Sequence, residues 1–94
     1  MKKVSAIIVN WNGKDVLSDC LQSLLKQNYA NLEIWVSDNG SEDGSQSMVT
    51  ETFPSVHLLE NGENLGFGTA INRVLQKAKA DYFLFLNNDL DLIC

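Results

Sequence analysis

The chain has 94 residues, of which 45% are hydrophobic and 20% are charged, and its formal net charge at pH 7 is −5. This length predicts a single domain spanning residues 1–94, and the composition is typical of a globular protein rather than a disordered one. The few basic residues are scattered along an acidic chain, which argues against nucleic acid as a partner. Every apolar run is too short to cross a bilayer and no signal-peptide core precedes Asn10, so the sequence predicts a cytoplasmic protein without a transmembrane segment.

Strand-like and helix-like segments alternate along the chain. Val4–Val9 is an apolar and β-branched run broken only by Ser5, typical of a buried strand. Apolar residues then recur at three- and four-residue intervals between Asp15 and Gln27, which predicts a helix. The alternation continues with a strand at Leu32–Ser37, a helix at Gly44–Phe53, a strand at Val56–Leu59, a helix at Phe67–Ala80 and a strand at Tyr82–Leu86. The last strand is apolar at every position, which predicts burial on both of its faces.

This β-α-β-α-β-α-β order predicts a Rossmann-like α/β domain, with a mostly parallel sheet, helices on both faces and right-handed crossovers. Ligands of such sheets bind beyond the carboxyl ends of the strands, where the strand order reverses. Polar loops follow three of the strands, at residues 10–13, 38–41 and 87–91. We therefore expect these loops to share one edge and to form the ligand site.

Asp38 lies where the second strand meets its turn. A carboxylate there is able to accept hydrogen bonds from a nucleobase imide or from ribose hydroxyls. It is equally able, with Asn39, to shape the turn and cap the following helix. The residues themselves leave both interpretations open.

The segment Asn87–Asp91 follows the most hydrophobic strand, so its side chains emerge at the carboxyl edge of the sheet. Carboxylates together with substrate phosphates commonly hold Mg²⁺ or Mn²⁺, and Asp89 is placed to do so. A solvated turn without a metal is the alternative.

The loop from Glu63 to Gly68 contains G-x-G but lacks the third glycine of a dinucleotide-binding motif. Gly66 and Gly68 permit close approach of the backbone to a ligand or to a neighbouring strand, and Asn64 and Asn72 offer amide contacts. Asn72 is also consistent with an ordinary exposed helix residue.

Taken together, four segments resemble one family. They are Ser5–Asn12, Val36–Ser45, Asn64–Gly68 and Phe85–Asp89, and they cover essentially the whole chain in order. They resemble the amino-terminal half of family 2 glycosyltransferases with the GT-A fold, and the Asn-Asn-Asp ending is most similar to rhamnosyltransferase-like members.

The resemblance implies a binding site for a nucleotide-diphospho-sugar donor, with a UDP- or dTDP-sugar as the first expectation. By similarity, the loop made by Val9, Asn10, Trp11 and Asn12 lines the base, and Asp38 contacts the base or ribose. Residues 64–68 and Asn72 help to enclose the nucleotide-sugar.

The family's Asp-x-Asp motif matches Asn87-Asn88-Asp89, so Asn replaces the first acid, Asn88 contacts the donor and Asp89 binds Mn²⁺ or Mg²⁺. A literal Asp-x-Asp also stands at residues 89–91, but the strand favours the first register. The metal would stabilise the leaving diphosphate during an inverting transfer.

The family's general base and acceptor-binding region lie downstream of the metal motif, so we expect a truncated domain that is inactive alone and contains no catalytic residue. The alternatives are a non-catalytic nucleotide-sugar-binding module and an α/β interaction module. In the family another strand flanks the fourth strand, so its open edge predicts a homo-oligomer or a complementing chain.

Overall fold

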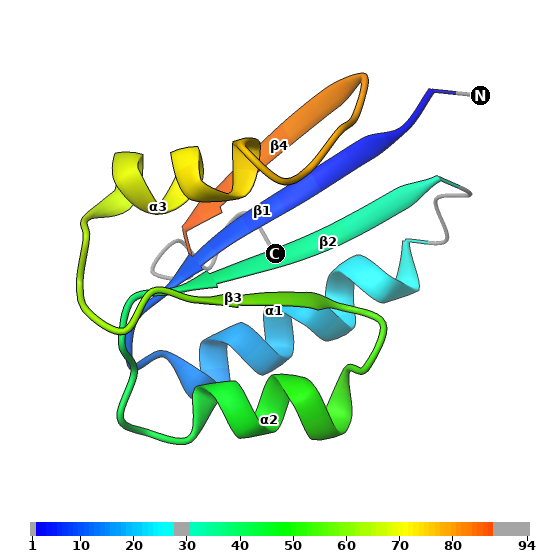
Figure 1. Cartoon of the computed structure of the whole chain (residues 1–94). Helices are drawn as coiled ribbons and strands as arrows, with labels where there is room; N and C mark the ends of the chain where they lie inside the picture. The colour runs from blue at the N-terminus through cyan, green and yellow to red at the C-terminus, as the bar shows by residue number, and fades with distance from the viewer. Residues whose placement is uncertain (1, 28–30, 88–94) are drawn as a thin grey trace.

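The computed structural model describes residues 2–27 and 31–87, which form four strands and three helices (Figure 1). In chain order these are β1 (Val4–Asn10), α1 (Lys14–Lys26), β2 (Leu32–Asp38), α2 (Ser45–Thr52), β3 (His57–Glu60), α3 (Phe67–Leu75) and β4 (Tyr82–Asn87). The predicted order of elements is therefore confirmed.

All of the strand pairs are parallel, and the order in the sheet is β3-β2-β1-β4. β1 lies between β2 and β4, with Asn10 opposite Asp38 and Val9 opposite Asn87. The chain moves outward from β1 through β2 to β3 and then returns to the other side of β1. The strand order thus reverses between β1 and β4, where ligands of open α/β sheets bind.

Helices cover both faces of the sheet, as predicted (Figure 1). Side chains alternate between the two faces along a strand, so Ala6 and Ile8 of β1 pack under α1 and α2 while Ile7 and Val9 pack under α3. The apolar stripe predicted for the first helix supplies Leu17, Leu21 and Leu24 to the first of these two clusters.

The third helix is shorter than predicted, since it ends at Leu75 rather than at Ala80. The chain tightens there, because the N–H of Lys77 donates to the carbonyl of Val74. This turn buries Ala78, and the N–H groups of Asp81 and Tyr82 then both donate to the carbonyl of Lys3 at the start of β4. Pairing with β1 therefore prevails over the helical periodicity of this segment.

The prediction that the fourth strand is buried on both faces is wrong. Leu86 is buried under α1, but Tyr82, Leu84 and Phe85 are 58%, 45% and 46% exposed. β4 pairs with β1 and is the last strand of the order, so no described strand shields its outer side. A hollow of about 330 Å³ with an almost wholly apolar lining lies beside its start, between Leu24, Leu32 and Tyr82.

None of the helices in the part of the chain that the structure describes is long and apolar enough to cross a membrane. The cytoplasmic location stays a prediction.

Candidate functional site

Two of the three polar loops meet at the carboxyl edge of the sheet, at the left of Figure 1. The ends of β1 and β2 are in register there, and the N–H of Asn39 donates to the carbonyl of Asn10 at 2.8 Å. The loop that leaves β3 joins them, because the N–H of Asn61 donates to the carbonyl of Asp38 at 2.8 Å. Of the third predicted loop the structure describes only Asn87, and Asn88 and Asp89 lie outside the described residues.

A buried hydrogen-bond network joins the first two loops. Nδ2 of Asn10 donates to Oδ1 of Asp38 at 2.8 Å and to Oγ of Ser41 at 3.1 Å. The hydroxyl of Ser41 itself donates to the same Asp38 oxygen at 2.7 Å. A buried carboxylate is stable only when such donors surround it, so these three side chains hold one another in place.

The second oxygen of Asp38 is also occupied. Oδ2 accepts the N–H of Ser41 at 2.9 Å and Nε2 of Gln46 at 2.8 Å. An ionised carboxylate offers about four acceptor positions, and four donors from the chain surround this one. Asp38 is only 1% exposed, and in this arrangement it shapes the turn after β2.

Asn12 fastens the first loop to the second. Its backbone has φ +52°, a left-handed conformation that asparagine tolerates, and its N–H donates to Oγ of Ser41 at 2.9 Å. Its Oδ1 accepts the N–H of Glu42 at 2.7 Å. Trp11 beside it is 54% exposed, so a large aromatic face stands open at the carboxyl edge of the sheet.

Asp43 caps two helices with one carboxylate. Oδ2 accepts the N–H of Lys14 at 2.9 Å, at the start of α1, and Oδ1 accepts the N–H of Ser45 at 3.0 Å, at the start of α2. Partial burial by itself raises the pKa of Asp43, but the Ser45 hydroxyl and the backbone N–H groups together hold this pKa below its usual range. The capping role that the sequence offered to Asp38 or Asn39 therefore belongs to Asp43.

A second network, built from amide side chains, fixes the loop between β3 and α3. Nδ2 of Asn39 donates to Oδ1 of Asn64 and to the carbonyl of Gly66, both at 3.3 Å. Oδ1 of Asn39 accepts Nδ2 of Asn61 at 2.9 Å, and Asn64 also accepts the N–H of Gly66 at 3.0 Å. One residue of the β2 turn thus contacts three residues of this loop.

Gly40 allows the two loops to come together. Its φ is +78°, and a Cβ placed there would lie 3.0 Å from backbone atoms of Glu63. Any side chain at this position would push the two loops apart.

The structure does not bring every predicted site residue into these networks. The side chain of Val9 lies in the core under α3, so only its backbone is available to a ligand. Asn72 is exposed on α3, and among the described residues its side chain belongs to neither network. Asn10 and Asp38 are buried, whereas Trp11 is exposed.

An open hollow of about 520 Å³ lies at this edge, at the start of α1. It is lined by Asn12, Gly13, Lys14, Asp15, Val16 and Asp43. Its volume falls within the range of small-molecule sites, and its lining carries both signs of charge.

The residues in place do not form a metal centre on their own. Within residues 2–27 and 31–87, no three His, Cys, Asp or Glu side chains come close enough to hold an ion. The acid that the sequence assigns to a metal, Asp89, follows the end of β4 by two residues.

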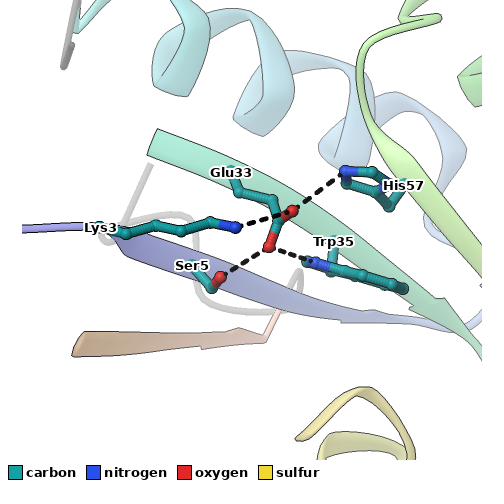
Figure 2. Close-up of polar contacts among 5 residues, drawn as sticks. All are labelled: Lys3, Ser5, Glu33, Trp35 and His57. Atoms are coloured by element: carbon teal, nitrogen blue, oxygen red, sulfur yellow. Dashed lines mark hydrogen bonds and ion pairs between the residues drawn. The ribbon is translucent and has the colours of Figure 1, made fainter. Parts of the chain in front are cut away.

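A separate polar cluster lies near the opposite ends of the strands, and Figure 2 shows it around Glu33. Oε2 of Glu33 accepts Nε1 of Trp35 at 2.8 Å and Oγ of Ser5 at 2.9 Å. Its Oε1 lies 3.5 Å from Nζ of Lys3 and 3.3 Å from Nε2 of His57, whose ring stacks on Trp35. Burial by itself raises the pKa of Glu33, but these hydrogen bonds and positive charges lower it overall. This cluster joins three strands and is not part of the carboxyl edge.

Sequence reasoning missed several residues of the two networks, namely Asn39 as a link between loops, Ser41, Gln46 and Asn61. The sequence predicts a turn around Gly40, but no spacing or motif along the chain predicts which distant residues its side chains bond to.

The comparisons with known proteins agree with this architecture. The model of the family "Glycosyl transferase family 2" matches residues 5–92. An Escherichia coli UDP-Glc:alpha-D-GlcNAc-diphosphoundecaprenol beta-1,3-glucosyltransferase is 36% identical over 87 residues, which are 92% of this chain and 34% of that protein. An N-acetylglucosaminyl-diphospho-decaprenol L-rhamnosyltransferase of Mycobacterium tuberculosis is 43% identical over 44 residues, or 47% of this chain and 14% of that protein.

Solved structures of glycosyltransferases share this fold. A mannosyltransferase from Pyrobaculum calidifontis, in complex with GDP-Man and Mn²⁺, superposes with a TM-score of 0.84 at 28% identity, over 94% of this chain and 28% of that one. S. aureus TarS superposes with a TM-score of 0.82 at 26% identity, over 93% of this chain and 27% of that one. The chain spans only 13% to 35% of the curated relatives that it matches. The family match and the GT-A fold that the described residues share with these structures show that the chain belongs to glycosyltransferase family 2.

Proposed function

We propose that this chain is the donor-binding part of an inverting glycosyltransferase and that it binds a UDP- or dTDP-sugar at the carboxyl edge of β1 and β2. The observation that carries the proposal is the joining of residues 10–12 and 38–41 by a buried network at the ends of β1 and β2, next to the point between β1 and β4 where the strand order reverses. The relatives support the donor class, since one is named for UDP-Glc and one structure holds GDP-Man.

In the proposed complex, the base lies against the exposed ring of Trp11 and the backbone of residues 9–12. Asn10 and Asp38 fix the shape of this surface, and Asp38 reaches the base or ribose when a ligand donor replaces Gln46 on Oδ2. Asn64, Gly66 and the exposed Asn72 border the nucleotide-sugar.

Asn88 and Asp89 belong to the diphosphate side of the proposed site. Asp89 would hold Mn²⁺ or Mg²⁺, which would neutralise charge on the leaving nucleoside diphosphate when bound. An acceptor hydroxyl would attack the anomeric carbon from the opposite face and lose its proton to a base. We assign that base to no residue of this chain, and we propose that the chain alone binds the donor without transferring the sugar.

Calorimetric titration with UDP, dTDP and GDP, each with and without Mn²⁺, tests the proposal. We expect binding that Mn²⁺ strengthens, with the metal effect abolished by Asp89→Ala. Glu51→Ala removes an exposed acid of α2 and is the matched control for the loss of one negative charge. If folded protein binds no nucleotide, the chain is an α/β interaction module instead, and nucleotide binding without any metal effect would contradict the role of Asp89.

We also propose that the outer edge of β4 binds a further strand, either from a second copy or from a complementing chain. Half-exposed Tyr82, Leu84 and Phe85 support this, because a bare apolar strand edge favours association. Sedimentation at tens of micromolar should show self-association of the chain, which Leu84→Lys should weaken. Strictly monomeric behaviour would contradict the homo-oligomer.

A further inference from the structure

We infer that Asn39 is a positioning residue that fixes the loop of residues 61–66 and thereby sets the affinity for the nucleotide. The inference rests on the proposed function, because it concerns how two sides of the same donor site are held in register. Asn39 itself need not touch the ligand.

The first argument is that the Asn39 side chain is fully committed to the loop. It is 3% exposed, its Nδ2 donates both of its hydrogens, to Asn64 and to Gly66, and its Oδ1 accepts from Asn61. An asparagine whose three bonds all go to one neighbouring segment acts as a clamp on that segment.

The second argument is the connection between this clamp and the base side of the site. Asp38, which precedes Asn39, is tied to Asn10, and Ser41, which follows Gly40, is tied to Asn12. Residues 38–41 therefore hold the loop of β1 with the side chains of Asp38 and Ser41 and the loop of β3 with the side chain of Asn39. The absence of a Cβ at Gly40 lets the two loops approach at the middle of this tetrapeptide.

The third argument is that the Asn39 donor matters more for residues 64–66 than for residue 61, which has anchors of its own. Asn61 is also held by its backbone bond to Asp38 and by its side-chain bond to Ser37 at 2.9 Å. Farther along, the side chain of Asn64 accepts from Asn39 and from Gly66. Removing the Asn39 donor therefore loosens residues 64–66 more than residue 61.

The decisive variant is Asn39→Asp, which keeps the shape but places an oxygen against Asn64 Oδ1 and the Gly66 carbonyl. Gln22→Glu is the matched control, because it makes the same amide-to-carboxylate change on the exposed face of α1. We expect hydrogen exchange at the Gly66 amide to accelerate about tenfold or more, with exchange at Ile8 in the middle of β1 unchanged. We expect the nucleotide Kd to rise about tenfold, as for the loss of one or two hydrogen bonds.

A double-mutant cycle with Asn39→Ala and Asn64→Ala separates positioning from general destabilisation, and it serves if Asn39→Asp does not fold. If Asn39 acts through Asn64, the double variant loses little more affinity than Asn64→Ala alone. Strictly additive losses, equal acceleration of exchange at Ile8 and Gly66, or a loosened loop with an unchanged Kd would each overturn the inference. A wild-type chain that binds no nucleotide overturns the proposed function instead, and the exchange measurement then decides alone whether Asn39 fixes the loop.

Discussion

The backbone N–H of Lys14, the first residue of α1, donates to Oδ2 of Asp43 at 2.9 Å across 29 positions of sequence. The other oxygen of the same carboxylate caps α2 through Ser45. The residue before α1 is Gly13 and the residue before α2 is Gly44, and neither carries a side chain able to cap its own helix. Asp43 thus ties the starts of two helices together beside the carboxyl edge of the sheet.

We predict that Asp43→Ala lowers the free energy of unfolding by about 1–2 kcal/mol, because loss of a cap costs about 1 kcal/mol per helix. Urea denaturation at pH 7 measures this change. Glu42→Ala, which removes the exposed neighbouring carboxylate, should leave the midpoint nearly unchanged. Equal losses from the two variants would contradict the capping role.

Because the pKa of Asp43 is lowered, the contribution of its carboxylate to the free energy of unfolding depends on pH. The pKa of this carboxyl is lower in the folded chain than in the unfolded chain. Its stabilising contribution is therefore complete at pH values above the pKa of the unfolded chain, and it is lost as the pH falls through the pKa of the folded chain. The stability difference between wild type and Asp43→Ala should therefore shrink on acidification below the usual Asp range. A difference that stays constant down to strongly acid pH would contradict this.

Glu33 should show the same sign of pH dependence at the other end of the sheet, since its pKa is also lowered. We predict that Glu33→Gln costs about 1 kcal/mol near neutral pH, because Lys3 loses its charged partner and Trp35 and Ser5 lose an ionised hydrogen-bond acceptor. The cost should diminish at acid pH, where the wild-type carboxyl is protonated too. Nucleotide affinity should not change, because this cluster is not part of the carboxyl edge. A loss of affinity would contradict this separation of the two regions.

Gly40 and Gly62 offer a matched pair, since their φ values are +78° and +79°. An added Cβ meets backbone of Glu63 at 3.0 Å in the first case and nothing within 4 Å in the second. We predict that Gly62→Ala costs about 1–2 kcal/mol from backbone strain alone and that Gly40→Ala costs about 1–3 kcal/mol more from the clash. Thermal unfolding of the two variants measures the difference, and equal losses would mean that the loops do not approach closely at Gly40.

Ser41→Ala should destabilise the chain by about 1–3 kcal/mol, because its hydroxyl joins Asp38, Asn10 and the backbone of Asn12 inside the fold. Ser47→Ala on the exposed face of α2 is the control and should be nearly neutral. Nucleotide affinity should fall with Ser41→Ala if the network shapes the base side of the site. Unchanged stability in denaturant titrations would contradict the buried network.

The sequence was sufficient for the order of elements, because the periodicities of strands and helices are local properties. It also placed two of the three polar loops correctly, since β1 and β2 end at one edge and Asp38 stands directly opposite Asn10 in the sheet. It failed where a local pattern competes with a distant contact. The helical spacing continues past Leu75, but the bonds from Asp81 and Tyr82 to Lys3 end α3 early. Similarly, an apolar run predicts burial of β4, yet exposure depends on whether a neighbouring strand is present.

What the sequence by itself determined is therefore the α/β architecture, the family and the loops that follow β1 and β2 at the carboxyl edge of the sheet. Only the tertiary structure decided which side chains of those loops hold one another. Asn39 with Asn64, Ser41 with Asn12 and Asp43 with Lys14 are pairs separated by 25 to 29 positions. Their hydrogen bonds form because the parallel sheet brings the strand ends together, and no propensity or spacing along the chain carries that information.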